Sequence, residues 1–278
     1  MISINYLEIN KRTFAAISED FIAGAISFDN FIIVIDSTLF PYTGKKLRNQ
    51  VEKVFKLPVK FLFLTHYHGD HLWGISAFKD VNILGSELLI KNAVNERPIQ
   101  QARFEEWMNK DPEKAKFINE IDTAFFPTIT FMNKVKIFDG DLSVELNQCG
   151  GHTSCSSYAY FPEEKVLFSG DIIFAQTWPW AGDPTCNPDS WIKTLEEIIK
   201  LDIDTVIPGH GPIVMKDEVE IQFNFLKDLR KEVIYTIEND EEIKKINIPP
   251  FYKDNTPGEW VKNETIKSFY NFYRNKFN

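Results

Sequence analysis

The chain has 278 residues, of which 44% are hydrophobic and 26% are charged, and its formal net charge is −9. This length and apolar content suffice to bury a large core, which excludes an intrinsically disordered chain. The acidic balance argues against a nucleic-acid partner or an anionic membrane surface, because binding phosphate groups requires clustered Lys and Arg.

The first residues of the chain show no basic, apolar and small-residue pattern of a secretion signal. No later run reaches the roughly 18 apolar residues of a membrane-spanning helix, so we expect a cytoplasmic protein without a membrane partner. Three cysteines, Cys149, Cys155 and Cys186, form no CxxC pair, which argues against a secreted disulfide framework. Cys149 and Cys155 flank His152 closely enough to be considered as metal ligands, although burial as small apolar side chains is favoured.

The first predicted elements form a β-α-β unit. Residues 31–37 and 60–65 are apolar runs that predict strands buried on both faces, and the second leads directly into His66. Between them, apolar residues at helical spacing predict a helix over 45–55, which Pro58 ends.

Residues from about 95 to 126 are charged and predict an inserted helical segment before residues 128–131 return to strand. The apolar stripes of this insert are Phe104, Trp107, Met108, Phe117, Ile118 and Ile121. The insert could form a lid, although core packing is favoured for these side chains.

Two later strands repeat one design. Residues 166–171 and 204–210 are each an apolar run that leads through a small residue to a candidate ligand. Between them, Asn187 and Pro188 predict the start of a helix, because Asn is a preferred N-cap and Pro a preferred first helical residue. The chain after residue 217 is mostly helical by composition.

Every histidine of the chain lies in a short segment that contains Gly or Asp. The segments are Thr65-His66-Tyr67-His68-Gly69-Asp70-His71, Gly150-Gly151-His152 and Pro208-Gly209-His210. Histidine is the commonest nitrogen ligand of first-row metals, so this usage indicates a metal protein. His66 and His68 project to the same side if the backbone stays extended, whereas Asp70 and His71 lie past a bend.

The number of candidate ligands favours two ions. A catalytic zinc ion typically takes three protein ligands and leaves a position for water. The candidates number seven, which is too many for one such ion: His66, His68, Asp70, His71, His152, Asp171 and His210. Asp70 and Asp171 could instead cap a helix or a turn, but their places beside the histidines favour ligation.

The order of these segments resembles the metallo-β-lactamase-fold hydrolase superfamily, from about residue 22 to 214. The resemblance rests on His66-x-His68-x-Asp70-His71, Gly151-His152-Thr153, Ser169-Gly170-Asp171 and Pro208-Gly209-His210-Gly211. It implies an α/β protein with a four-layer αββα sandwich and with metals between the edges of its two sheets. We expect a catalytic domain over residues 1–214 and a C-terminal helical extension over 215–278, packed on the same unit.

The resemblance also implies two ligand sets. His66, His68 and His152 form the first, whereas Asp70, His71 and His210 form the second, and Asp171 bridges both. The expected cofactors are two Zn²⁺ per chain, with Fe or Mn as alternatives. A metal-bridging hydroxide then attacks the substrate, and we expect Asp70 to act both as a ligand and as the catalytic general acid or base.

Asp171 narrows the predicted branch of the superfamily. Many true metallo-β-lactamases carry a cysteine ligand at this point, so the aspartate favours the branch of glyoxalase II, lactonases and other ester-type hydrolases. We expect a zinc-dependent hydrolase that acts on a small-molecule ester, thioester or lactone. The alternatives are a mononuclear iron persulfide dioxygenase of the same fold, a β-lactamase, and a phosphodiesterase or nuclease.

Two further points stay open in the sequence. The segment Trp178-Pro179-Trp180 could place aromatic surface beside the metals, where an apolar substrate group would stack, or it could pack in the core. The oligomeric state is not encoded in any pattern, and a homodimer is one of the alternatives.

Overall fold

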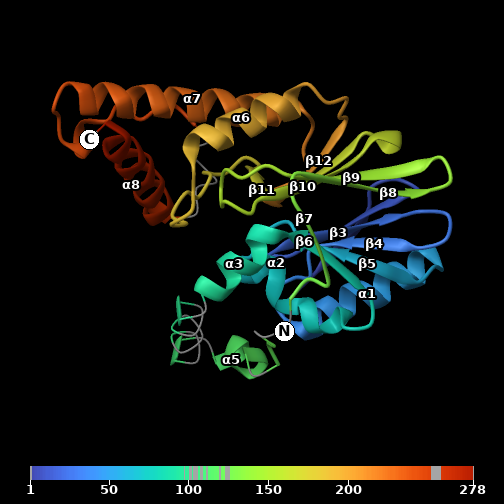
Figure 1. Cartoon of the computed structure of the whole chain (residues 1–278). Helices are drawn as coiled ribbons and strands as arrows, with labels where there is room; N and C mark the ends of the chain where they lie inside the picture. Colours follow the sequence, from blue (N-terminus) through green and yellow to red (C-terminus); the bar gives the residue numbers. More distant parts are fainter. Residues whose placement is uncertain are drawn as a thin grey trace.

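Two β-sheets face each other in the computed structural model, and helices cover their outer faces (Figure 1). The structure describes residues 2–96, 98–99, 102, 106, 109–110, 112–118, 120–122, 126–251 and 258–277. The layers follow the order helix, sheet, sheet, helix, which confirms the predicted αββα fold class.

The first sheet has seven strands in sequence order. They are β1 (Asn5–Glu8), β2 (Thr13–Ile17), β3 (Ile22–Ser27), β4 (Ile32–Ile35), β5 (Val59–Phe63), β6 (Asn82–Ser86) and β7 (Ile129–Phe131). Neighbours are antiparallel up to β4 and parallel from β4 onward. Helix α1 (Pro41–Phe55) connects β4 to β5, which confirms the β-α-β unit. The helix begins before the predicted residue 45, because Pro41 suits a first helical turn.

The second sheet has the order β12-β11-β10-β9-β8. The strands are β8 (Lys134–Asp139), β9 (Leu142–Gln148), β10 (Ser157–Phe161), β11 (Val166–Phe174) and β12 (Thr205–His210). Only β11 and β12 run parallel among them, and helix α6 (Pro188–Ile199) connects the two. The side chain of Asn187 accepts a hydrogen bond from the amide of Ser190 at 3.0 Å, so the predicted N-cap is confirmed.

The core between the sheets is built from the inner faces of both. Phe63 on the first sheet belongs to one buried cluster with Leu146, Phe161 and Phe168 on the second. Burying a Phe or Leu side chain contributes about 1.5–3 kcal/mol relative to exposure, so this layer holds the two sheets together.

The C-terminal helices pack on the second sheet. Helix α7 (Asp217–Glu238) lies along α6 and helix α8 (Gly258–Phe277) packs against α7 (Figure 1). Phe225 and Phe269 from these helices share a buried cluster with Trp191 of α6 and Ile172 of β11. The extension therefore completes the core on this side of the sheet.

Shorter helices lie beside the first sheet. They are α2 (Gly69–Leu72), η1 (Trp73–Phe78), α3 (Glu87–Asn95) and α5 (Pro112–Ile118), and η2 (Pro162–Glu164) and η3 (Ile243–Lys245) occur later. The α5 helix belongs to the predicted insert, and the ring of Phe117 lies 4.0 Å from that of Tyr42. Phe104, Trp107 and Met108 lie outside the described residues. Within the described part of the chain, no helix combines the length and apolar content that crossing a membrane requires.

Candidate metal centre

The predicted ligands lie where the ends of several strands meet. His66 follows β5, and His68 is the N-cap residue of α2, which carries Asp70 and His71. His152 lies in the turn between β9 and β10, and His210 ends β12. These strand ends come from both sheets, so the ligands converge between the layers.

Asp171 differs from this pattern, because β11 continues past it to Phe174. The pairing of β11 with β12 shifts register on both sides of Gly170, which has a left-handed φ of 50°. Such an irregularity re-aims the following side chain. A Cβ on Gly170 would also lie 2.6 Å from Oγ1 of Thr65, so glycine is required there for two reasons.

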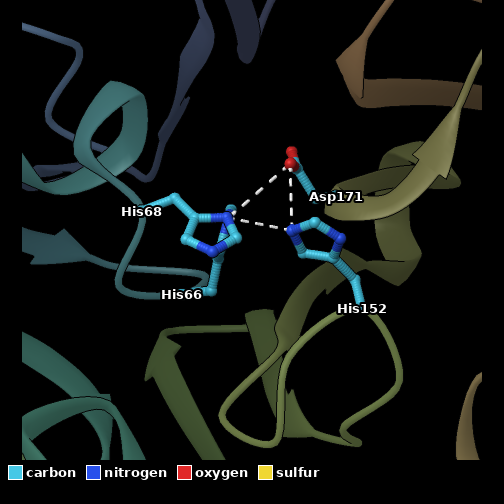
Figure 2. A group of neighbouring side chains, drawn as sticks. All are labelled: His66, His68, His152 and Asp171. Atoms are coloured by element: carbon cyan, nitrogen blue, oxygen red, sulfur yellow. Dashed lines mark hydrogen bonds and ion pairs between the residues drawn. The ribbon is translucent and has the colours of Figure 1, made fainter. Parts of the chain in front are cut away.

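The first group of ligands is buried and close-packed (Figure 2). Nε2 of His66 and Nε2 of His152 each lie 3.0 Å from Nδ1 of His68. Oδ2 of Asp171 lies 3.6 Å from Nε2 of His66 and 3.3 Å from Nε2 of His152. Each of the four side chains thus offers one donor atom to the same small volume.

The second group shares Asp171 with the first. Nε2 of His71 and Nε2 of His210 lie 3.4 and 3.3 Å from Oδ2 of Asp70. Asp171 approaches the same histidines, with distances of 3.0 Å to Nε2 of His71 and 3.4 Å to Nε2 of His210. The structure therefore brings all seven predicted ligands together and sets Asp171 between the two groups.

Two buried atoms of the cluster support a metal fit. Nε2 of His71 and Oδ1 of Asp171 lie 3.0 Å apart, yet neither atom makes an aligned hydrogen bond among the described residues. A buried polar atom without a partner is costly, and a cation held between imidazole nitrogens and carboxylate oxygens would satisfy both atoms. The donor set and its geometry thus fit divalent metal ions.

Outer partners orient four of the histidines. His68 donates through Nε2 to Oδ2 of Asp183 at 2.9 Å, and His71 donates through Nδ1 to Oδ2 of Asp36 at 2.7 Å. His152 donates through Nδ1 to the backbone carbonyl of Trp180 at 2.9 Å. Because carbonyl and carboxylate oxygens only accept, these bonds fix the tautomer and leave the other nitrogen facing the cluster. Nδ1 of His66 lies 3.1 Å from the hydroxyl of Thr65.

A family model described as the metallo-β-lactamase superfamily matches residues 24–210, which is more than half of the chain. The chain belongs to the metallo-β-lactamase superfamily. Membership confirms the resemblance that the ordered motifs indicated.

Individual relatives are distant. The linear primary-alkylsulfatase of a Pseudomonas species is 22% identical in an alignment of 262 residues, and the match covers 81% of this chain and 50% of the relative. The hydroxyacylglutathione hydrolase of Psychromonas ingrahamii is 27% identical over 120 residues, which are 43% of this chain and 35% of the relative. The structure of an inverting sec-alkylsulfatase from Pseudomonas is similar in fold, with a TM-score of 0.78 and 14% identity, over 97% of this chain and 50% of the other. The chain thus spans half or less of the length of these relatives.

Asp36 and Asp183 hold histidines of the candidate centre, and neither was predicted from the sequence as a site residue. Asp36 is buried after β4 and accepts hydrogen bonds from the amide and the hydroxyl of Thr65, both at 2.8 Å, besides the bond from His71. Burial raises the pKa of Asp36. A signal existed, because Asp36 directly follows the apolar run of β4, much as Asp171 follows an apolar run in the sequence. Asp183 lies 115 residues from His68, and nothing in its local sequence links the two.

In the metal-free protein, the histidines of the two groups differ in their pKa values. Burial would lower the pKa of His71 and of His210, but the nearby carboxylates outweigh it and raise the pKa of His71 well above its ordinary value and that of His210 to about 10. Burial lowers the pKa of His152 to about 4 and that of His66 well below its ordinary value. The second group therefore holds protons that a metal would displace, whereas His66 and His152 of the first group are neutral imidazoles.

The two carboxylates of the centre are ionised. Burial would raise the pKa of Asp70 and of Asp171, but the charges and hydrogen bonds of His71 and His210 outweigh it and hold both well below the ordinary range. Two negative oxygen donors are thus ready to balance part of the charge of bound cations.

The two tryptophans of the segment Trp178-Pro179-Trp180 lie in different places, one beside the candidate centre and one in the core. The ring of Trp180 lies 5.4 Å from that of His68 and 5.7 Å from that of His152, so aromatic surface does border the centre. Trp178 is buried and packs against Phe225 in the core. The three cysteines are free thiols, and none belongs to a ligand group in the described part of the chain.

Proposed function

We propose that this chain is a dinuclear metal-dependent hydrolase that cleaves a small ester, thioester or lactone. Membership of a superfamily of metal-dependent hydrolases supports hydrolysis at the His and Asp cluster. The observation that carries the dinuclear proposal is the position of Asp171, which lies 3.3 Å from His152 in one group and 3.0 Å from His71 in the other.

The proposal assigns the ligands as the sequence predicts. His66, His68 and His152 would hold one ion, and the second group would hold the other, with Asp171 shared. When bound, two divalent ions would supply Lewis acidity and lower the pKa of the water that they hold. We propose zinc because it accepts nitrogen and oxygen donors readily, with Fe or Mn as alternatives.

Asp70 is the carboxylate best placed to move a proton. Its side chain is 24% exposed, whereas that of Asp171 is 4% exposed. His210 is also on the open side, with an exposed fraction of 32%. A substrate would therefore approach past Asp70 and His210, and Asp70 can exchange a proton with solvent after accepting it from water or giving it to the leaving group.

Replacement of Asp70 by Asn tests this role. Because an amide does not accept the proton, we expect kcat to fall by about 100-fold at neutral pH, in line with general acid–base contributions. Elemental analysis of the same sample separates proton transfer from metal loss. A variant that keeps both ions and full kcat would show that Asp70 is a ligand only.

Metal content and a substrate panel test the whole proposal. We expect about two zinc ions per chain by elemental analysis and turnover of p-nitrophenyl acetate, a short thioester or a small lactone. Uptake of a single iron with oxygen consumption on a persulfide would instead establish the dioxygenase. Turnover of nitrocefin alone or of bis-p-nitrophenyl phosphate alone would establish a β-lactamase or a phosphodiesterase.

A second candidate is hydrolysis of an alkyl sulfate ester. It is favoured by the likeness to the alkylsulfatase structure, which extends over 97% of this chain at a TM-score of 0.78. Release of inorganic sulfate from a secondary octyl sulfate, without turnover of acyl esters, would establish it. A cytoplasmic location and a domain boundary near residue 214 belong to the main proposal as the sequence predicts them.

A further inference from the structure

A cavity of about 110 Å³ lies beside the first ligand group, and His68 forms part of its wall. We call it the His68 pocket and define it by His68, Tyr67, Trp73, Glu96, Trp180 and Asp183, with the backbone of Gly69 and Gly182. Tyr67 and Trp73 are almost fully buried, so this wall is a fixed part of the core. Among the described lining residues, His68 is the candidate ligand that borders this aromatic enclosure.

The wall that carries Trp180 is also fixed in place. The hydroxyl of Thr265 on α8 donates to the carbonyl of Pro179 at 2.7 Å and accepts from the amide of Ala181 at 3.1 Å. These two bonds flank Trp180, and Thr265 itself is fully buried. The loop that carries Trp180 is thus held in place by the side chain of Thr265.

The charge of the pocket is negative. Asp183 and Glu96 both belong to its wall, and no Lys or Arg lines it among the described residues. Asp183 already accepts hydrogen bonds from His68 and from the hydroxyl of Tyr67. Among the described residues, an anionic group in the pocket would meet two carboxylates and no cationic side chain, which is unfavourable. The pocket therefore favours an uncharged group.

One donor in the wall is unused. Nε1 of Trp180 is buried and has no hydrogen-bond partner in the described ranges. A Cβ added at Gly182 would lie 2.7 Å from this nitrogen, so only glycine lets the backbone approach the indole edge. An oxygen acceptor on a bound group would remove the cost of the unpaired N–H.

The volume limits the size of the group. An engineered apolar cavity of about 150 Å³ holds benzene, so the His68 pocket suits about five non-hydrogen atoms or fewer. A short acyl chain or part of a small lactone ring has this size, whereas an octanoyl chain does not.

We propose that the His68 pocket is a substrate subsite for a short, uncharged group, and this inference rests on the proposed acyl hydrolase function. The group next to the reacting carbonyl would lie against Tyr67, Trp73 and Trp180, beside the ion held through His68. The pocket would select substrates by the size and by the charge of this group. Substitutions in the wall can alter each preference separately.

Two substrates that differ in charge test whether the pocket disfavours an anionic group. We expect the zinc-loaded protein to cleave p-nitrophenyl butyrate with a kcat/KM at least tenfold above that for the p-nitrophenyl monoester of succinate, which carries a carboxylate. Glu96→Lys should narrow this ratio about fivefold, because a nearby positive charge offsets the repulsion. Glu87→Lys is the matched control, since Glu87 is exposed at the other end of the same helix and should leave the ratio unchanged.

Two esters that differ in the length of the acyl chain test whether the pocket limits the size of the bound group. We expect wild type to cleave p-nitrophenyl octanoate at least tenfold less efficiently than the butyrate, and Trp180→Leu to reduce that difference severalfold. The backbone carbonyl of Trp180, which holds His152, is kept in this variant. Equal cleavage of butyrate, octanoate and the succinate monoester by wild type would overturn the pocket while leaving the hydrolase proposal intact.

Absence of any ester turnover would contradict the proposed function and would move the test to binding. Saturation-transfer NMR with butyramide then decides the pocket on the zinc-loaded protein. Binding that wild type shows and Trp180→Leu loses would support the subsite. Equal signals from the two proteins, or no signal from wild type, would overturn it.

Discussion

At the scale of single residues, the centre depends on side chains that touch no candidate metal position. Asp36 holds the imidazole of His71 and the backbone of Thr65 at the same time. Outer partners of this kind set both the tautomer and the direction of a ligand. The candidate ligands could be predicted from the sequence because histidines are few and clustered, whereas Asp36 is one acid among many until its contacts are known.

We expect Asp36→Asn to weaken metal binding by the second group about 10- to 100-fold, because an amide replaces the acceptor of the His71 bond. Competition with a chromophoric chelator measures the two affinities separately. Asp29→Asn is the matched control, since Asp29 is exposed and pairs with Arg12 far from the centre. Unchanged affinity in Asp36→Asn would contradict the role assigned to this carboxylate.

The protonation of the second group predicts how metal uptake depends on pH. The pKa of His210 is about 10, so its imidazole is protonated in the metal-free protein at pH 8, and the nearby carboxylates raise the pKa of His71 as well. Each imidazole must be neutral to bind a cation. The affinity of this group should therefore rise with pH up to about 10, which is the pKa of His210.

The first group should behave differently, because the pKa of His152 is about 4 and its imidazole is already neutral at pH 8. Calorimetric titrations in two buffers of different ionisation enthalpy count the protons released. We expect filling of the second group to release more protons than filling of the first, with at least the proton of His210 released. Equal release from both groups would show that the charge division is wrong.

At the scale of elements, one loop links α8 to the first ligand group. The backbone of Trp180 holds His152, Asp183 holds His68, and Thr265 holds the loop between them. Helix α8 lies beyond the residues that the family model matches, 24–210. The C-terminal helix therefore contributes to a candidate centre whose predicted ligands all precede it in the sequence.

We expect Thr265→Val to lower the metal affinity of the first group about tenfold and to leave the second group unchanged, because the loop loses both hydrogen bonds. Cobalt substitution with absorption spectroscopy reports the two groups. Thr265→Ser should restore the affinity. Thr236→Val is the control, since this buried hydroxyl bonds only within its own helix, to the carbonyl of Glu232. Equal losses in both valine variants would indicate a general effect on stability.

The sequence predicted the elements that carry ligands better than the rest of the fold. Strands β4, β5, β11 and β12 are rich in apolar residues, because most of their positions are buried in a layered protein. Strand β8 alternates between exposed and half-buried residues. It therefore lacks the continuous apolar run by which a buried strand is predicted. The bond between His68 and Asp183 joins residues far apart, and no local pattern specifies such a contact.

At the scale of the whole molecule, the C-terminal extension is part of one packed unit. The side chain of Gln222 on α7 accepts from the amide of Phe174 at 2.8 Å and donates to the carbonyl of Ile172 at 2.7 Å. These bonds fix β11 directly after Asp171. The extension thus supports the strand that supplies the shared ligand, besides burying apolar surface on α6.

We expect a chain that ends at residue 214 to lose cooperative thermal unfolding, because removal of α7 and α8 exposes the cluster around Trp191 and leaves two backbone groups of β11 unpaired. Circular dichroism melting compared with the full chain measures this. A truncated chain with a sharp transition and both metals would show that residues 1–214 fold as an independent domain.

Gly170 affects several parts of the candidate centre at once, because it has no Cβ. Its left-handed backbone aims Asp171, and its bare Cα lets Thr65 approach and stay bound to Asp36. An alanine there would disturb the shared ligand and the outer support of His71 together. In a saturation mutagenesis screen, this residue, which has no side chain to react or to bind, should tolerate replacement as poorly as the histidines around it.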